Sequence, residues 1–275
     1  MLRGRSWLAL ATVPALAACS LVYASDLDDA RKPTFSVDAG AEGGAPPVVV
    51  TEAGADVVTP PATGCAAFPA ANFCDDFDTQ LNVGDGWDKI VLTNDTTSKA
   101  AFDALSYSTP KSFRASLVGA QGCAFARLEK RFSVGARRVT TSVRMRPEAP
   151  WKDDAAVLLM ALTGCGIILS LGQDAPSYSS YVNVQFGDPL QNYVRDVDGF
   201  PTPDEWTDVT LDAKAIDGGV RLDVIYDHAS GARDDKQLDL PQCSLSGGSS
   251  LVGLGFHCSQ DTHDVRYDDV RVSWE

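Results

Sequence analysis

Apolar and polar residues alternate along several short segments of this 275-residue chain, and this period of two constrains its fold most. In residues 139–145, Val139 and Val143 fall on one face, with Arg144 on the other, and residues 220–226 repeat the pattern. Such alternation is typical of a strand with one buried face. We find no convincing amphipathic helix, so the sequence predicts an all-β fold.

Other apolar runs complete the set of strands. Residues 155–162 and 166–171 flank Thr163-Gly164-Cys165, which predicts a hairpin. We expect further strands in six segments: 89–93, 112–118, 125–132, 181–186, 206–211 and 251–257. About a dozen strands without helices predict a two-sheet antiparallel β-sandwich, or jelly roll.

The last strand changes phase. Val265, Tyr267 and Asp269 alternate with polar residues, but the next inward row begins at Val270. The sequence therefore predicts either a β-bulge between Asp269 and Val270 or a row that faces the other side.

The first residues are typical of an export signal. Arg3 and Arg5 precede an apolar run of about 12 residues, which is too short to span a bilayer. Leu16-Ala17-Ala18-Cys19 resembles the lipobox of bacterial lipoproteins. That resemblance implies a signal peptide at 1–18, cleavage before Cys19, a lipid on Cys19 that anchors the chain to the membrane and, since Ser20 follows, the outer membrane. The alternative is an ordinary secretory signal that contains a cysteine.

Composition divides the rest of the chain. Ala, Gly, Pro and Asp dominate the segment after Cys19, so residues 19–64 are predicted to be a flexible tether, reaching roughly 35–40 Å. Aromatic residues and regular periods begin at Cys65, so residues 65–275 are predicted to form one domain. The net charge of −14 argues against a nucleic-acid partner.

Six cysteines remain once Cys19 carries lipid, since 7 − 1 = 6. No C-x-x-C or H-x-x-x-H spacing occurs, so disulfides in an oxidising compartment are favoured over zinc. Fifteen pairings are open. We expect Cys65–Cys74 as a short loop, Cys123–Cys165 between strands, and Cys243–Cys258 across a hairpin.

Two end segments carry a family resemblance. Phe73-Cys74-Asp75-Asp76-Phe77-Asp78 is followed by Gly86-Trp87 and by 105–115, and the chain closes with Tyr267-Asp268-Asp269-Val270-Arg271-Val272. This order resembles bacterial concanavalin A-like lectin/glucanase domains, including the laminin-G-like group. The resemblance implies two curved sheets that bind glycans or proteins on the concave face or rim. It implies no single activity, because that fold carries lectins, hydrolases, lyases and inert modules.

Catalytic motifs are weak. The E-x-D-x-E run of retaining glucanases of that fold is absent, and no G-x-S-x-G elbow occurs. A polysaccharide lyase would use Tyr, His, Arg and an amide side chain. Tyr181, Asn183 and Gln185 share one face of a strand, but no histidine lies on it.

Sugar binding needs exposed rings with polar groups beside them. The candidate ligand-binding residues are Trp151, Tyr178, Tyr181, Asn183, Gln185 and Tyr193. Trp87, Trp206 and Trp274 stand in apolar settings and are expected in the core. An ordinary folded edge with surface tyrosines is the alternative.

Calcium prefers clustered carboxylates. Asp76, Asp78, Asp268 and Asp269 would become neighbours if the terminal strands pair, so we expect a structural calcium site there. The alternative is a solvated acidic edge. No cofactor is required by the sequence.

These observations favour a non-catalytic binding module, anchored in the bacterial cell envelope, with a glycan as its ligand. The first alternative is a polysaccharide lyase or glycoside hydrolase with a divergent active site. The second is a structural or protein-interaction lipoprotein.

Overall fold

The structure is a computed structural model that describes residues 64–275, except residues 95, 150, 152–153, 175–176, 187–190 and 198. These residues belong to a unit that spans Thr59–Glu275. The predicted signal peptide, the lipidation residue Cys19 and nearly all of the predicted tether lie outside the described residues.

The described residues are almost entirely β. After a short 3-10 turn, η1 (Gly64–Ala67), thirteen strands follow in order: β1 (Phe73–Asp75), β2 (Lys89–Leu92), β3 (Ser98–Asp103), β4 (Ser112–Gly135), β5 (Arg138–Pro147), β6 (Ala155–Leu162), β7 (Cys165–Asp174), β8 (Ser177–Phe186), β9 (Gln191–Val197), β10 (Thr207–Ile216), β11 (Gly219–His228), β12 (Arg233–Leu240) and β13 (Ser246–Trp274). The predicted all-β fold is confirmed.

Antiparallel pairing links all of these strands. The main order is β12-β11-β10-β5-β13-β6-β7-β8-β9, while β4 pairs with β13, β2 and β3, and β1 pairs with β13. The ladder is therefore continuous, and hydrogen bonding does not divide it into the two separate sheets that we expected.

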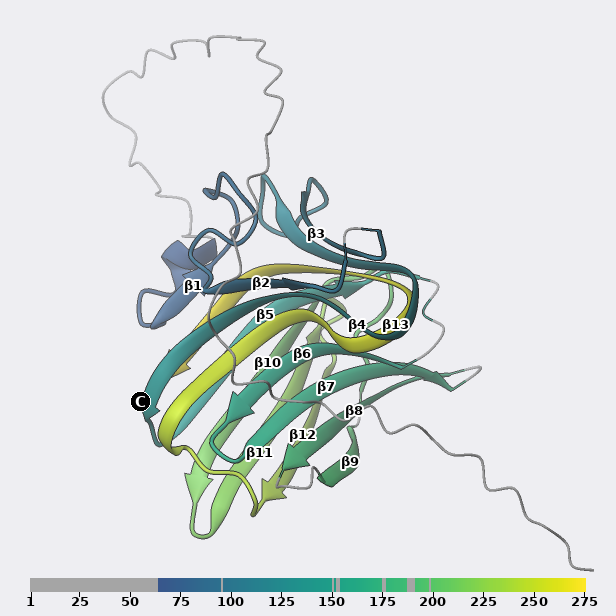
Figure 1. Cartoon of the computed structure of the whole chain (residues 1–275). Helices are drawn as coiled ribbons and strands as arrows, with labels where there is room; N and C mark the ends of the chain where they lie inside the picture. Colours follow the sequence, from purple (N-terminus) through teal and green to yellow (C-terminus); the bar gives the residue numbers. More distant parts are fainter. Residues whose placement is uncertain are drawn as a thin grey trace, which may run out of the picture. The chain divides into compact units, whose positions relative to one another are not determined.

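The long strands β4 and β13 run side by side and connect two halves of this ladder (Figure 1). Residues 251–254 of β13 lie between β4 and β6, whereas residues 265–267 lie between β4 and β5. Register shifts between Phe256 and His263 mark where β13 bends. The segments 112–118 and 125–132, expected as two strands, are both part of β4, because β4 follows β13 through this bend.

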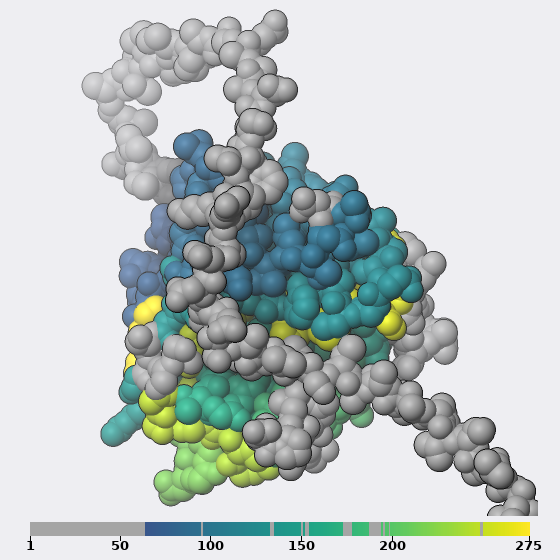
Figure 2. Space-filling view, viewed as in Figure 1, coloured from purple at the N-terminus to yellow at the C-terminus, as the bar shows by residue number. Residues whose placement is uncertain are grey.

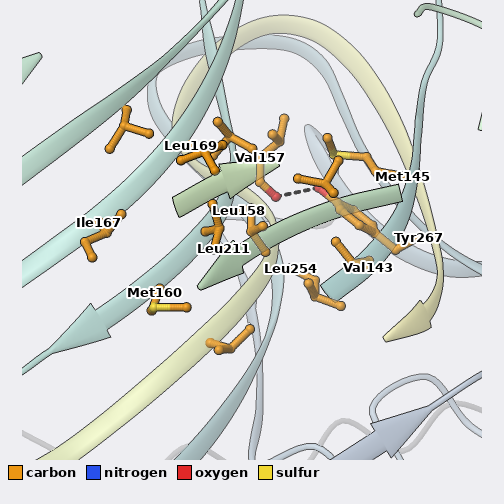
Figure 3. Packing of buried hydrophobic residues seen from close by; sticks show 14 of the residues in the cluster. Val143, Met145, Val157, Leu158, Met160, Ile167, Leu169, Leu211, Leu254 and Tyr267 are labelled. Carbon is orange, nitrogen blue, oxygen red and sulfur yellow. Dashed lines mark hydrogen bonds between the residues drawn. The ribbon is translucent and has the colours of Figure 1, made fainter. Parts of the chain in front are cut away.

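Both halves contribute side chains to one core. Val157 and Leu169 come from β6 and β7, while Val143 and Leu211 come from β5 and β10, and all four are fully buried (Figure 3). The Tyr267 hydroxyl donates a hydrogen bond to the backbone carbonyl of Val157 at 2.6 Å. Far along the core, the Tyr226 hydroxyl of β11 donates to Ser180 Oγ of β8 at 3.1 Å.

Three disulfides join Cys65 to Cys74, Cys123 to Cys258, and Cys165 to Cys243. The first pair confirms the prediction, and the predicted Cys123–Cys165 and Cys243–Cys258 pairs are wrong. Cys123 and Cys258 directly precede Ala124 and Ser259, which pair in the bend where the register of β4 and β13 shifts. The bridge between Thr163 and Ser244 brings the segments that contain Cys165 and Cys243 together.

The first strand of the domain lies against the last. Phe73, Cys74 and Asp75 of β1 pair with Val272, Arg271 and Val270 of β13. In the space-filling view, atoms of the early segment (blue) accordingly lie beside those of β13 (yellow) (Figure 2). Within the described part of the chain, no helix is long and apolar enough to span a membrane.

Candidate functional site

A β-bulge in β13 shapes a polar site on the outward face of β5 and β13. The register between β13 and β5 shifts between Asp268 and Arg271, and Asp269 has a φ of 47°. Positive φ is uncommon for residues other than glycine, and bulges often redirect side chains near functional sites. Of the two readings of the phase change in this strand, the bulge is confirmed.

Asp268 holds a distant loop. Its carboxylate accepts hydrogen bonds from the backbone N–H groups of Tyr107 and Ser108, each at 2.9 Å, and from the Ser108 hydroxyl at 3.0 Å. The carboxylate thus satisfies two successive N–H groups of a segment that belongs to no strand. This interaction places Tyr107 over the outward face of β5.

Tyr107 forms an exposed aromatic platform. The residue is 53% exposed, its ring centre lies 3.7 Å from the Arg144 guanidinium carbon, and the ring meets the Trp206 ring edge-on at 6.3 Å. Arg144 is itself fixed by two carboxylates, because it donates to Asp208 at 2.9 Å and to Asp269. The platform is therefore rigid on its charged side and open to solvent on the other.

A second cation lies next to this platform. Arg271 pairs in register with Ser142, two residues from Arg144 on the same face of β5. Its guanidinium carbon lies 3.8 Å from the centre of the Phe68 ring. Arg271 and Phe68 line a cavity of about 300 Å³. The rest of its lining comes from Thr140, Ser142, Ser273 and the other residues of 67–71.

We call this surface the β5–β13 groove, and define it by Phe68, Tyr107, Ser142, Arg144, Trp206 and Arg271. Tyr107 and Trp206 lie at one end and Phe68 at the other. Arg144, Ser142 and Arg271 lie between them. Ser142 and Thr210 share a hydrogen bond of 2.9 Å on the same face. Such a mixture can stack on the faces of sugar rings and hydrogen-bond their hydroxyls.

Burial dominates the electrostatics beneath the groove. It raises the pKa of Asp268 to about 6, against the hydrogen bonds that favour the ionised form. It also raises the pKa of Asp269, with Arg144 and Arg271 opposing the shift. Burial lowers the pKa of Arg271, since the charged form loses hydration there.

The structure separates the predicted ligand-binding residues. The prediction for Trp151 is wrong: its side chain is fully buried, it donates to the Leu171 carbonyl at 3.1 Å, and it packs on Phe256. Contacts with Phe256 and His263 hold this ring in the core. It cannot stack on a ligand.

The other predicted residues lie on β8 and β9, in the other half of the ladder. Tyr178 is exposed and stacks on Phe200 at 4.9 Å. Tyr181, Asn183 and Gln185 alternate with the buried Val182 and Val184 on β8, so they share its outward face. The side chain of Tyr193 lies outside the described residues.

The predicted calcium ligands are partly gathered. Asp78 lies close enough to Asp76 and Asp269 for their charges to raise its pKa, although burial is the larger cause. The carboxylates are used within the protein: Asp76 accepts from the Cys65 N–H at 3.1 Å, and Asp268 holds the Tyr107 loop. Among the described residues, no group of three or more potential ligands has the arrangement of a metal site. Calcium stays a prediction.

The sequence pattern does not point to the groove residues, because the predicted ligand-binding residues form a local cluster of aromatic and amide side chains. Trp206 was expected in the core, but it is only partly buried. Arg144 was visible as the charged residue on the polar face of residues 139–145. Tyr107 and Arg271 stood inside the resemblance motifs, yet their meeting depends on pairing across more than 150 residues.

Comparisons with known proteins give no family. No family model matches the chain, and no curated protein matches it. Among solved structures it is similar to the PL-14 alginate lyase from Aplysia kurodai, at 6% identity over 64% of this chain and 87% of that one, with a TM-score of 0.49. It is also similar to the alginate lyase from Klebsiella pneumoniae (10% identity, 63% and 84% covered, TM-score 0.45) and to the CBM2 module of the Lactobacillus casei BL23 phage J-1 evolved Dit (12%, 75% and 98%, 0.45). With all three scores below 0.5, we base no argument on these similarities.

Proposed function

We propose that this protein binds a polysaccharide chain along the β5–β13 groove and does not cleave it. The observation that carries the proposal is the exposed Tyr107 ring, fixed between Arg144 and Trp206. A rigid exposed ring contributes stacking area at little cost in conformational entropy. Arg144 and Ser142 are about 7 Å apart along β5, so polar groups follow one another in the direction of the strand. A linear ligand fits this arrangement.

Binding is favoured over catalysis by the state of the titratable groups. Arg127 donates to Nδ1 of His257 at 2.7 Å, and burial lowers the pKa of that imidazole to about 3. The Nδ1 atom of His257 is therefore already engaged by a guanidinium. In the groove, Asp208 and Asp269 are both paired with Arg144.

Glycoside hydrolysis is the second candidate function. It would need a pair of carboxylates, and Asp208 and Asp269, which both contact Arg144, are the pair that the groove offers.

We also infer that a lipid on Cys19 anchors the protein in the envelope, with residues 20–64 as a tether and the domain beginning at Cys65. The two halves of the ladder would act as the two sheets of a jelly roll, since side chains from both contribute to one core. Replacing Cys19 with Ala should release the protein from the membrane fraction. Retention of the variant in that fraction would contradict the anchor.

The first experiment is a binding screen with the unlipidated Cys19→Ala chain, oxidised, by affinity electrophoresis through gels that contain neutral or acidic polysaccharides. Reducing ends are assayed in the same samples. Retardation without released sugar supports the proposal, and released sugar establishes the hydrolase. Mobility equal to that in a blank gel for every polysaccharide would overturn both.

Two matched tyrosine variants locate the site. Tyr107→Ala should weaken retention about tenfold, or ~1.4 kcal/mol, because it removes the platform. Tyr178→Ala removes an equally sized exposed ring from the other half and should leave retention unchanged. The reverse result would transfer the site to the face of β8 that carries Tyr181, Asn183 and Gln185.

A further inference from the structure

Arg271 differs from the arginines around it. Arg144 pairs with Asp208 and Asp269, and Arg138 pairs with Asp212 at 2.8 Å. No carboxylate of the described residues forms an ion pair with Arg271, and its Nε is buried without a hydrogen-bond partner. In a chain with 37 acidic and 23 basic residues, a half-buried arginine without an ion pair is unexpected.

An unpaired charge in this position destabilises the free protein. Burial of a polar group without a hydrogen-bond partner is unfavourable, and more so when the group is charged. Asp208 and Asp269 influence Arg271 only through space. A negative group that reached the guanidinium would offset this cost, so the missing partner points to a ligand.

The cavity next to Arg271 has the size and the lining for such a group. It measures about 300 Å³, and Ser142 and Arg271 of the groove line it. The Phe68 ring covers one face of the guanidinium, with 3.8 Å between the ring centre and the guanidinium carbon. The hydroxyls of Ser142 and Ser273 lie in the same lining and suit the hydroxyls of a sugar.

We propose that Arg271 recognises the carboxylate of an acidic sugar residue, so that the groove selects uronic acid-containing polysaccharides. This inference rests on the proposed function, because the sugar chain must lie along the β5–β13 groove. A planar carboxylate matches the two parallel N–H donors of a guanidinium edge, and charge-assisted pairs of this kind are stronger than neutral hydrogen bonds. The adjacent Tyr107 platform would bind the next residues of the same chain.

The test compares one polymer with and without its charge. Binding of the unlipidated chain to polygalacturonate and to its carboxyl-reduced form is measured by calorimetry at fixed salt. We expect at least tenfold tighter binding of the acidic form. Arg271→Gln should abolish that preference, so that the variant binds both forms with similar affinity. Arg221→Gln serves as the matched control and should keep the preference. Arg221 is a surface arginine of β11 that pairs with Asp239 of β12.

Failure of this inference can be told apart from failure of the proposed function. Equal binding of both polymers by the unmutated chain, still weakened by Tyr107→Ala, overturns the role of Arg271 and leaves the groove as the binding site. A preference that survives in Arg271→Gln overturns it as well. Tighter binding of a sulfated galactan than of polygalacturonate would overturn the assignment to a carboxylate. Absence of binding to any of these polymers overturns both proposals.

Discussion

The Asp268 carboxylate accepts a hydrogen bond from the backbone N–H of Tyr107, a residue 161 positions earlier in the chain. The bulge that follows Asp268 turns Asp269 toward Arg144, which contacts the Tyr107 ring. One irregularity in β13 therefore positions both the backbone and the ring of Tyr107. The geometry of the groove depends on these two adjacent carboxylates.

Replacing Asp268 with Ala should loosen the Tyr107 loop without removing any surface group of the groove. Two backbone N–H groups lose their acceptor, which predicts a loss of about 1–3 kcal/mol in the free energy of unfolding. Amide hydrogen exchange at Tyr107 and Ser108 should become faster, and glycan retention should fall. Asp239→Ala, at an exposed residue, is the control. Unchanged exchange at both amides would contradict this role of Asp268.

The sequence allowed the strands to be predicted well, because alternation is a local property. Residues 220–226 and the hairpin at 155–171 are found as predicted. The bend in β4 was not predictable, since it is imposed by β13. The site was harder to predict for the same reason: neither Arg271 nor Tyr107 is distinctive until pairing over a long sequence separation brings each to Arg144 or Ser142.

Trp151→Ala should act on stability and not on binding. The ring is fully buried and contacts Phe256 and His263, so truncation leaves a large cavity. We expect a loss of about 3–5 kcal/mol in the free energy of unfolding, measured by urea denaturation. The fraction that remains folded should bind polysaccharide as the unmutated chain does. A loss of affinity at unchanged stability would return Trp151 to the binding site.

The pH dependence of stability should have two opposing contributions, because burial raises the pKa of two carboxyl groups and lowers the pKa of one histidine. Burial raises the pKa of Asp75 and of Asp268 from 3.8 to about 6, so their contribution to stability is present below about pH 3.8 and is lost as the pH rises through 6. Burial lowers the pKa of His257 from 6.5 to about 3, so its contribution is present above pH 6.5 and is lost as the pH falls toward 3.

Between pH 4 and 6 these contributions oppose each other. Removing one group should therefore change the slope of the free energy of unfolding against pH. In Asp75→Asn the free energy of unfolding should decrease less with rising pH than in the unmutated chain. In His257→Gln it should decrease more steeply. Urea midpoints at half-unit intervals of pH measure both slopes, and identical slopes in all three proteins would refute the assignment of these groups.

The disulfides should differ in their effect on stability according to the loop that each one closes. Cys165–Cys243 spans 78 residues and Cys65–Cys74 spans 9. Chain entropy then predicts losses of about 4.5 and 2.5 kcal/mol for the paired Ala variants, because the longer loop restricts the unfolded chain more. Peptide mapping of the oxidised protein should link Cys123 to Cys258. A Cys123–Cys165 peptide would contradict the pairing of β4 with β13 at the bend, since both Cys123 and Cys258 lie in that bend.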